Sequence, residues 1–146
     1  MELCFYQTGA GNLVPSAARL LEKIYASGER CLVYSADEER LKAVDKTLWT
    51  FSTNAFIPHG DRNLGFCHRQ PIYLTNQWEN PNGATILLLL ETVDHEQCAE
   101  NFKRIICIFQ DAPQIERAQA IYDDLKKNQE NVNYWKQSSG GWEKVT

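Results

Sequence analysis

The sequence has no long hydrophobic run, no pair of cysteines at metal-binding spacing and no excess of basic residues. Its longest apolar stretch, residues 84–90, is interrupted by Thr85, whereas a membrane-spanning helix needs about 20 apolar residues in succession. The five cysteines are an odd number at scattered positions, with no Cys-x-x-Cys motif. We therefore expect no membrane contact, no disulfide framework, and neither a bound metal nor any other cofactor.

Acidic side chains outnumber basic ones by 19 to 15, which gives a formal net charge of −4. A generally basic surface, the usual mark of direct nucleic-acid binding, is therefore absent, although a local patch of cations is compatible with this balance. The N-terminus has no basic region followed by an apolar run and a cleavage site, so no secretion signal is predicted. We expect a cytoplasmic protein whose thiols are reduced and buried.

With 146 residues, of which 43% are hydrophobic, the chain is expected to form one globular domain over residues 1–146 that buries roughly two-thirds of its unfolded surface. Short apolar runs predict strands, and apolar residues at intervals of three and four predict helices. The strands are expected at residues 3–7, 30–35, 55–57, 71–75 and 84–91. The helices are expected at residues 15–27, 35–49, 94–109 and 114–128.

Two of these assignments depend on particular residues. Ser35-Ala36-Asp37-Glu38 has the Ser-x-x-Glu pattern of a capping box, in which both side chains bond free backbone amides at a helix start. After Asp94, apolar residues recur on one helical face as far as Phe109; residues 105–109 alone also fit a strand, but the longer period favours a helix. The alternation of strands and helices predicts an α/β fold, a Rossmann-like open and mostly parallel sheet with helices on both faces. Whether the tail, residues 132–146, docks on this domain or is mobile is left open.

The motifs of nucleotide and acyl chemistry are incomplete. Gly9-Ala10-Gly11 follows the first predicted strand, but Val14 stands where the dinucleotide fingerprint needs its third glycine. No Gly-Lys-Ser/Thr triplet and no Gly-x-Ser-x-Gly elbow occur. Cys67 and His68 are adjacent, which does not make a catalytic pair, and His59 suits a hydrogen-bonded strand end better than an acid–base role. No catalytic residues are therefore predicted, and no intrinsic enzymatic activity is expected.

Aromatic residues and cations instead indicate contacts with other proteins. Residues 48–74 combine apolar and aromatic side chains with a polar loop, and a connection of this length is often functional. Trp135 and Trp142 lie in the tail, where tryptophan near cations is typical of an interface anchor or of a seal over the core. Cations also gather in the last third of the chain, although neighbouring carboxylates dilute them.

Several of these segments resemble, in order and over nearly the whole chain, the chi-subunit family of the bacterial DNA polymerase III holoenzyme, whose members are clamp-loader accessory proteins. The most specific match is Leu48-Trp49-Thr50-Phe51 followed by Phe56-Ile57-Pro58-His59. The other matching residues are Phe5-Tyr6, Pro71-Ile72-Tyr73-Leu74, Phe102 with Arg104, Tyr122, Tyr134-Trp135 and Gly141-Trp142.

The resemblance implies a Rossmann-like fold without nucleotide chemistry and a bridging role in DNA replication. One implied partner is the psi subunit of the clamp loader. The other is the acidic C-terminal tail of single-stranded DNA-binding protein, so that DNA is contacted indirectly. The implied psi-binding residues are Trp49, Phe56, Pro58 and His59. The implied acidic-tail site lies on the last helix and consists of Tyr122, Arg117, Lys126 and Lys127.

The acidic-tail site departs from the family pattern. The family usually has a basic residue three positions before the aromatic residue and another directly after it, but Gln119 and Asp123 occupy these positions here. A carboxylate-rich peptide needs charge-assisted partners, so cations of adjacent helical turns are required in their place.

Two other functional classes stay open. A small nucleotide-binding or hydrolytic enzyme on the same fold needs the turn at residues 9–12 and His59 to face one cleft, and the fold alone does not decide this. A direct single-strand binder would stack bases on Trp135 and Trp142 beside lysines. The net charge argues against the second class, whereas stacking residues aligned on one face would favour it.

Overall fold

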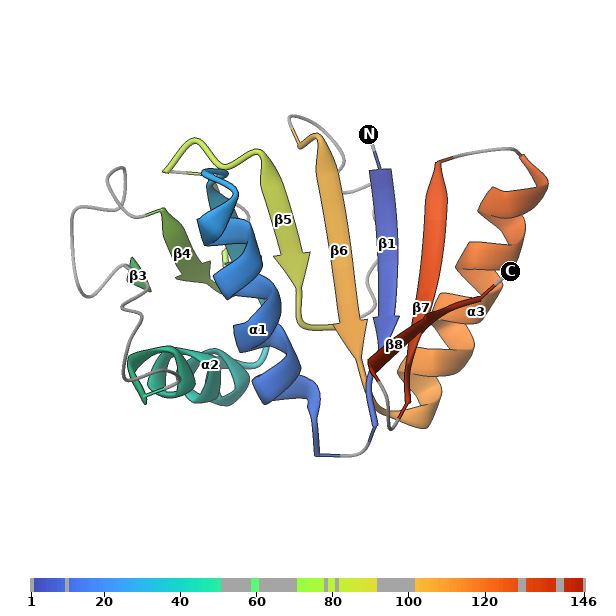
Figure 1. The fold of residues 1–146 in the computed structure, drawn as a ribbon, viewed down its shortest axis with the longest axis horizontal. Helices are drawn as coiled ribbons and strands as arrows, with labels where there is room; N and C mark the ends of the chain where they lie inside the picture. The colour runs from blue at the N-terminus through green and yellow to red at the C-terminus, as the bar shows by residue number, and fades with distance from the viewer. Residues whose placement is uncertain are drawn as a thin grey trace.

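The computed structural model describes residues 2–9, 11–50, 59–60, 71–77, 79–80, 82–91, 102–128, 131–138 and 141–145, with residues 59 and 60 described through their backbone alone. Within these residues the chain forms an eight-stranded sheet in the order β3-β4-β2-β5-β6-β1-β7-β8 (Figure 1). Every neighbouring pair is parallel except β7 and β8, which are antiparallel. The strands are β1 Glu2–Gln7, β2 Cys31–Tyr34, β3 His59–Gly60, β4 Ile72–Thr75, β5 Ile86–Leu89, β6 Arg104–Phe109, β7 Val132–Ser138 and β8 Gly141–Lys144.

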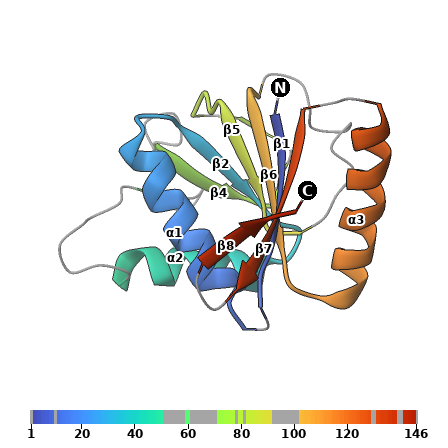
Figure 2. The same ribbon diagram turned by 45° about the vertical axis from the view of Figure 1, so that its right-hand side comes forward.

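Helices cover both faces of the sheet. Helices α1, Leu13–Ala26, and α2, Glu38–Thr50, lie on one face, and α3, Ala112–Lys127, lies on the other (Figure 2). Alternate side chains of each strand point to opposite faces. In β1, for example, Cys4 belongs to the apolar cluster under α1, whereas Leu3 and Phe5 belong to the cluster under α3. The predicted Rossmann-like α/β fold, with an open and mostly parallel sheet, is confirmed.

The helix predicted to reach Phe109 is wrong at its C-terminal end. Residues Arg104–Phe109 form β6, which lies between β5 and β1. Because layers on both sides cover this central strand, all five residues from Ile105 to Phe109 are buried, and two-sided burial produces a continuous apolar run. Together with the preceding apolar residues, such a run has the spacing of an apolar helix face. The predicted helix start at Asp94 lies outside the described residues, as does the strand predicted at residues 55–57.

The second helix begins two residues later than the capping box predicts. Asp37, not Ser35, caps α2: its Oδ1 accepts bonds from the amides of Glu39 and Arg40, at 3.0 and 3.4 Å. Ser35 is buried at the end of β2, and its hydroxyl oxygen accepts a bond from the amide of Asp37 at 3.0 Å. The Glu38 carboxylate bonds the side chain of Asn76 instead of returning to the helix start. An aspartate at the N-cap satisfies free backbone amides of the first helical turn, as the predicted serine cap would.

The tail docks as part of the sheet. Strand β7 pairs in parallel with β1, which brings Tyr134 beside Phe5, and β8 returns antiparallel to β7. The ring of Tyr134 is 1% exposed and lies 5.9 Å from that of Phe5, between centroids. The question that the sequence leaves open is thus answered for the described residues, since β7 completes the core under α3.

Three of the five cysteines lie in the described residues, and all three, Cys4, Cys31 and Cys107, are buried thiols that form no disulfide. Burial raises the pKa of Cys4 to about 11 and raises that of Cys31 as well. The thiols of Cys4 and Cys31 are therefore protonated at neutral pH, as expected for buried structural cysteines. Cys67, with its neighbour His68, and Cys98 lie outside the described residues.

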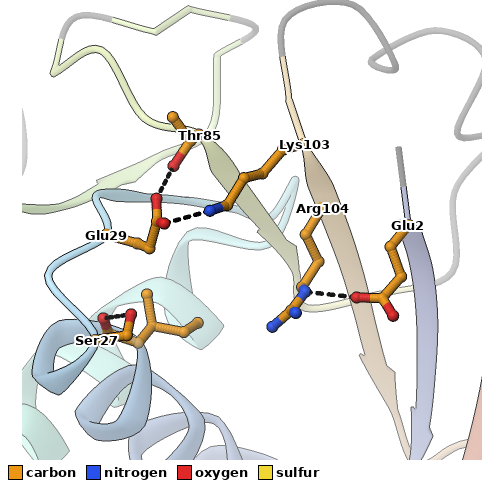
Figure 3. Close-up of polar contacts among 7 residues, drawn as sticks. Glu2, Ser27, Glu29, Thr85, Lys103 and Arg104 are labelled. Atoms are coloured by element: carbon orange, nitrogen blue, oxygen red, sulfur yellow. Dashed lines mark hydrogen bonds and ion pairs between the residues drawn. The ribbon is translucent and has the colours of Figure 1, made fainter.

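A small polar network ties together three segments at the amino-terminal edge of the parallel strands. The Glu29 carboxylate accepts a bond from the hydroxyl of Thr85 at 2.5 Å and forms an ion pair with Lys103 (Figure 3). The bonds from Lys103 and then Thr85 hold the pKa of Glu29 below its usual value. The network joins the loop before β2 to the starts of β5 and β6.

Candidate protein-binding surfaces

Helix α3 carries the residues predicted to bind an acidic tail, and Tyr122 is the point at which it meets the end of the chain. The Tyr122 ring is only 7% exposed and lies 5.5 Å from that of Tyr134, between centroids. Its hydroxyl donates to the carbonyl oxygen of Val145 at 3.3 Å. The Lys126 Nζ lies 5.6 Å from the centre of the Tyr122 ring, within cation–π range. The tyrosine is thus the floor of this surface, and the ammonium group is its exposed edge.

The other two predicted cations are on the same helix but on different sides of it. Arg117 and Lys127 are both exposed, and helical geometry places each about 140° around the axis from Tyr122. Of the four predicted residues, the structure therefore brings together Tyr122 and Lys126.

The two positions that depart from the family pattern lie on exposed parts of α3. Gln119 forms a hydrogen bond with the hydroxyl of Tyr134, and that hydroxyl donates to the Gln7 Oε1 at 2.6 Å. Burial raises the pKa of Tyr134 to about 12, and the bond to Gln119 opposes this rise. Asp123 is exposed beside Tyr122 in sequence and contributes a negative charge. Among the described residues of α3, Lys126 thus brings a cation to Tyr122, and Asp123 adds a carboxylate next to it in sequence.

The residues predicted to bind psi lie at the other end of the sheet. Trp49, in the last turn of α2, is 52% exposed, the largest exposed fraction among the large hydrophobic side chains of the described residues. Helix α2 packs against β3 and β4, and the backbone of His59 in β3 pairs with Ile72. Phe56 and Pro58 lie outside the described residues. The structure therefore places the helix of Trp49 and the strand of His59 at one edge of the sheet.

The two candidate surfaces are separated by the whole width of the sheet. Strand β3 forms one edge, and β7 with β8 forms the other, so the end of α2 and the helix α3 lie at opposite ends in Figure 1. They also lie on opposite faces (Figure 2). Two partners can therefore occupy them without overlapping.

The turn after β1 has the place of a phosphate-binding loop, but side chains of the protein occupy its amides. The amide of Gly9 donates to the Gln137 Oε1 at 3.0 Å. The amides of Gly11 and Leu13 both donate to the Gln110 Oε1, at 3.2 and 3.3 Å. In dinucleotide-binding folds, amides at this position bind the pyrophosphate. A phosphate here would have to displace both glutamines. No local motif marks them, because Gln110 follows β6 and Gln137 lies in β7, both far from this turn in the sequence.

Within the described residues, no group of three or more histidine, cysteine, aspartate and glutamate side chains is arranged to hold a metal ion. In the same part of the chain, no helix has the length and hydropathy needed to cross a bilayer.

Comparison with known proteins gives the family. The family model described as "DNA polymerase III chi subunit, HolC" matches residues 1–132. The "Probable DNA polymerase III subunit chi" of Rickettsia prowazekii (strain Madrid E) is 32% identical over 113 residues, which cover 73% of this chain and 68% of the relative. The "DNA polymerase III subunit chi" of Pseudomonas aeruginosa PAO1 is 29% identical over 102 residues, 70% of each chain. The chain belongs to the family of DNA polymerase III chi subunits.

Proposed function

We propose that this chain is a non-catalytic accessory subunit of the replicative DNA polymerase, located at the cytoplasmic replisome. In this role it joins the psi subunit of the clamp loader to the acidic C-terminal tail of single-stranded DNA-binding protein. The observation that carries the proposal is the placement of two candidate surfaces at opposite edges and faces of one sheet. A bridge needs this separation, because each partner must bind without excluding the other. No bond is made or broken.

The psi contact is assigned to the edge formed by α2 and β3. Large aromatic side chains are the usual anchors of protein interfaces because they bury much apolar area for little conformational entropy. Trp49 supplies such an anchor, being 52% exposed at the end of α2. An apolar contact of this kind is expected to change little with salt concentration.

The acidic-tail contact is assigned to the surface of α3 around Tyr122. In this proposal Lys126 pairs with carboxylates of the tail, and the apolar end of the tail packs beside Tyr122, whose ring lies against the buried Tyr134. Since charge pairing dominates, binding is expected to weaken as salt rises. With Gln119 and Asp123 in place of cations, the affinity is expected to be modest.

The test is a fluorescence-anisotropy titration with a labelled acidic peptide that ends in an apolar residue. The wild-type protein is compared with Lys126→Glu at low and moderate salt. Lys42→Glu is the matched control, because Lys42 is an exposed lysine of α2 whose side chain is 72% exposed and pairs only with Glu39 among the described contacts. We expect salt-sensitive binding that falls roughly tenfold in Lys126→Glu and is unchanged in Lys42→Glu.

Absence of binding at low salt would contradict the acidic-tail half of the proposal. Equal weakening by both charge reversals would contradict the location on α3, because it would indicate a response to net charge alone. The psi half has its own test, which is co-purification with the psi subunit. This association should be lost in Trp49→Ala and retained in Lys126→Glu.

A further inference from the structure

Aromatic side chains cover one end of the sheet on the face that carries α1. Helix α1 lies over the middle of this face, and β1, β7 and β8 extend beyond it (Figure 1). On these strands Tyr6, Trp135 and Trp142 come together. The rings of Tyr6 and Trp135 stack with an interplanar angle of 13° and centroids 6.3 Å apart. Trp142 meets Tyr6 edge to face at 5.0 Å. The ring of Tyr6, near the start of the chain, and the two tryptophan rings of β7 and β8 thus form one platform.

Two adjoining hollows lie between this platform and α1. The first, of about 280 Å³, has Leu20 and Ile24 on the helix side and Ile106 on the sheet, opposite the three rings. The second, also of about 280 Å³, extends along α1 past Ser16 to Gln137. Leu20, Lys23 and Trp142 line both. We call the two hollows together the aromatic groove. Each is slightly smaller than the range of about 300–1,000 Å³ that is typical of small-molecule sites.

Cations follow the groove along its length. Lys23 and Arg104 line the first hollow, and Arg19, one turn before Lys23 on α1, lines the second. The Lys144 Nζ lies 5.9 Å from the centre of the Trp135 ring.

Two carboxylates lie beside these four cations. Arg104 donates from its Nε to Glu2 at 2.7 Å (Figure 3), and Glu22 lines the second hollow. Among the described residues, the groove therefore has four cations beside two carboxylates, in a chain whose net charge is −4.

We infer that the aromatic groove binds single-stranded nucleic acid directly. Rings offer flat surfaces on which any base can stack, and spaced cations follow a phosphate backbone. A site for an acidic peptide terminus would have its cations concentrated at one point. Here the cations of the protein extend over two adjoining hollows. Trp135 and Trp142 follow residue 132, where the family match ends. The groove would add a direct contact with the strand to the proposed protein bridge.

The test is the binding of a fluorescently labelled oligothymidylate, followed by anisotropy at several salt concentrations. The wild-type protein is expected to bind weakly at low salt, with quenching of tryptophan fluorescence as bases stack. Lys23→Glu reverses an exposed charge of the groove and should weaken binding roughly tenfold and make the salt dependence shallower. Trp142→Leu should weaken binding at least about fivefold through loss of stacking. Lys42→Glu on α2 is the matched control and should bind as the wild type does.

Three results would overturn the inference. They are no binding at low salt, equal weakening in Lys23→Glu and Lys42→Glu, or loss of acidic-peptide binding in Lys23→Glu while oligothymidylate binding persists. The last result would assign the groove to a peptide. Lys126→Glu separates this inference from the proposed bridge, because it should lose the peptide and keep the oligonucleotide. Circular dichroism of each variant confirms that the fold is intact.

Discussion

Around Tyr122 two side chains, Gln119 and Asp123, limit the positive charge available for an acidic partner. Lys126 lies above the ring at 5.6 Å, while Asp123, the next residue after Tyr122, is exposed and of opposite charge. Gln119, on the side of the helix that faces Tyr134, contributes hydrogen bonding and no charge. Because a charge-assisted hydrogen bond contributes about 1.5–3 kcal/mol, each missing cation matters for a carboxylate-rich ligand.

Restoring cations at these two positions should produce a gain of function. The double variant Gln119→Arg and Asp123→Lys should bind the acidic peptide about tenfold or more tightly than the wild type at low salt. The gain should shrink as salt rises, since screening weakens exposed pairs. The measurement is the same anisotropy titration. An unchanged affinity would show that the peptide does not contact this side of α3. Glu39→Lys on α2, which adds two of these three positive charges at another place, should have little effect.

Glu29 predicts a pH dependence of stability. Its pKa is lowered in the folded protein, first by the bond from Lys103 and then by that from Thr85. A carboxylate whose pKa is lower in the folded than in the unfolded protein stabilises the fold at pH values above its unfolded pKa of 4.5. This stabilisation is lost as the pH falls through the folded pKa. The Tm difference between the wild type and Glu29→Gln should therefore be largest at neutral pH and should close in acid.

The control uses the partner of Glu29. In a Lys103→Gln background, the Glu29→Gln substitution should change the Tm at neutral pH by less than it does in the wild type, because the pair is already broken. A Tm difference that widens as the pH falls would contradict the role assigned to Glu29.

At the scale of elements, β6 and β8 are two strands that local sequence patterns are not sufficient to predict. The apolar run from Ile105 to Phe109 is compatible with either a helix or a strand until its neighbours are known, and the sheet on both sides decides it. Strand β8 carries Gly141 and two charged residues and has little strand propensity of its own. It forms because β7 pairs with it and because Trp142 packs on Tyr6.

The packing of Trp142 predicts a loss of stability on truncation. Trp142→Ala should lower the free energy of unfolding by about 2 kcal/mol, because it removes the edge-to-face contact with Tyr6 and uncovers part of the platform. Urea denaturation measures this as a lower midpoint with an unchanged slope. Trp49→Ala is the matched control, since that ring is already 52% exposed and should cost less. Equal losses would contradict the packing role of Trp142.

At the scale of the whole molecule, the alternation of strands and helices along the sequence predicts the fold. The sequence predicts the candidate surfaces only in part. Strand–helix alternation and the strand lengths are sufficient for an open α/β sheet. The sequence also indicates Trp49 and the last helix. Its helical periodicity places Tyr122 on the inward face, which is confirmed, but it does not indicate that Gln110 and Gln137 bond the amides of the glycine turn or that Tyr6 meets Trp142. Each of these depends on contacts between segments far apart in the chain, which no local pattern encodes.

The sheet also explains how two contacts can be held at a fixed distance. The parallel strands between β3 and β7 form one continuous hydrogen-bonded layer with apolar clusters on both faces. Such a layer is close-packed and deforms little. In the proposed bridge it keeps the psi contact and the acidic-tail contact apart whichever partner binds first, so the two binding events should be independent.

The most direct test of the bridge is a capture experiment with immobilised psi subunit and fluorescent single-stranded DNA-binding protein, without DNA. The account predicts that the fluorescent protein is retained only when this chain is added and only when its own acidic tail is intact. Trp49→Ala should abolish retention of both proteins, whereas Lys126→Glu should remain bound to psi and fail to retain the fluorescent one. Competition between psi and the acidic tail for this chain, or retention that survives removal of the tail, would contradict the account.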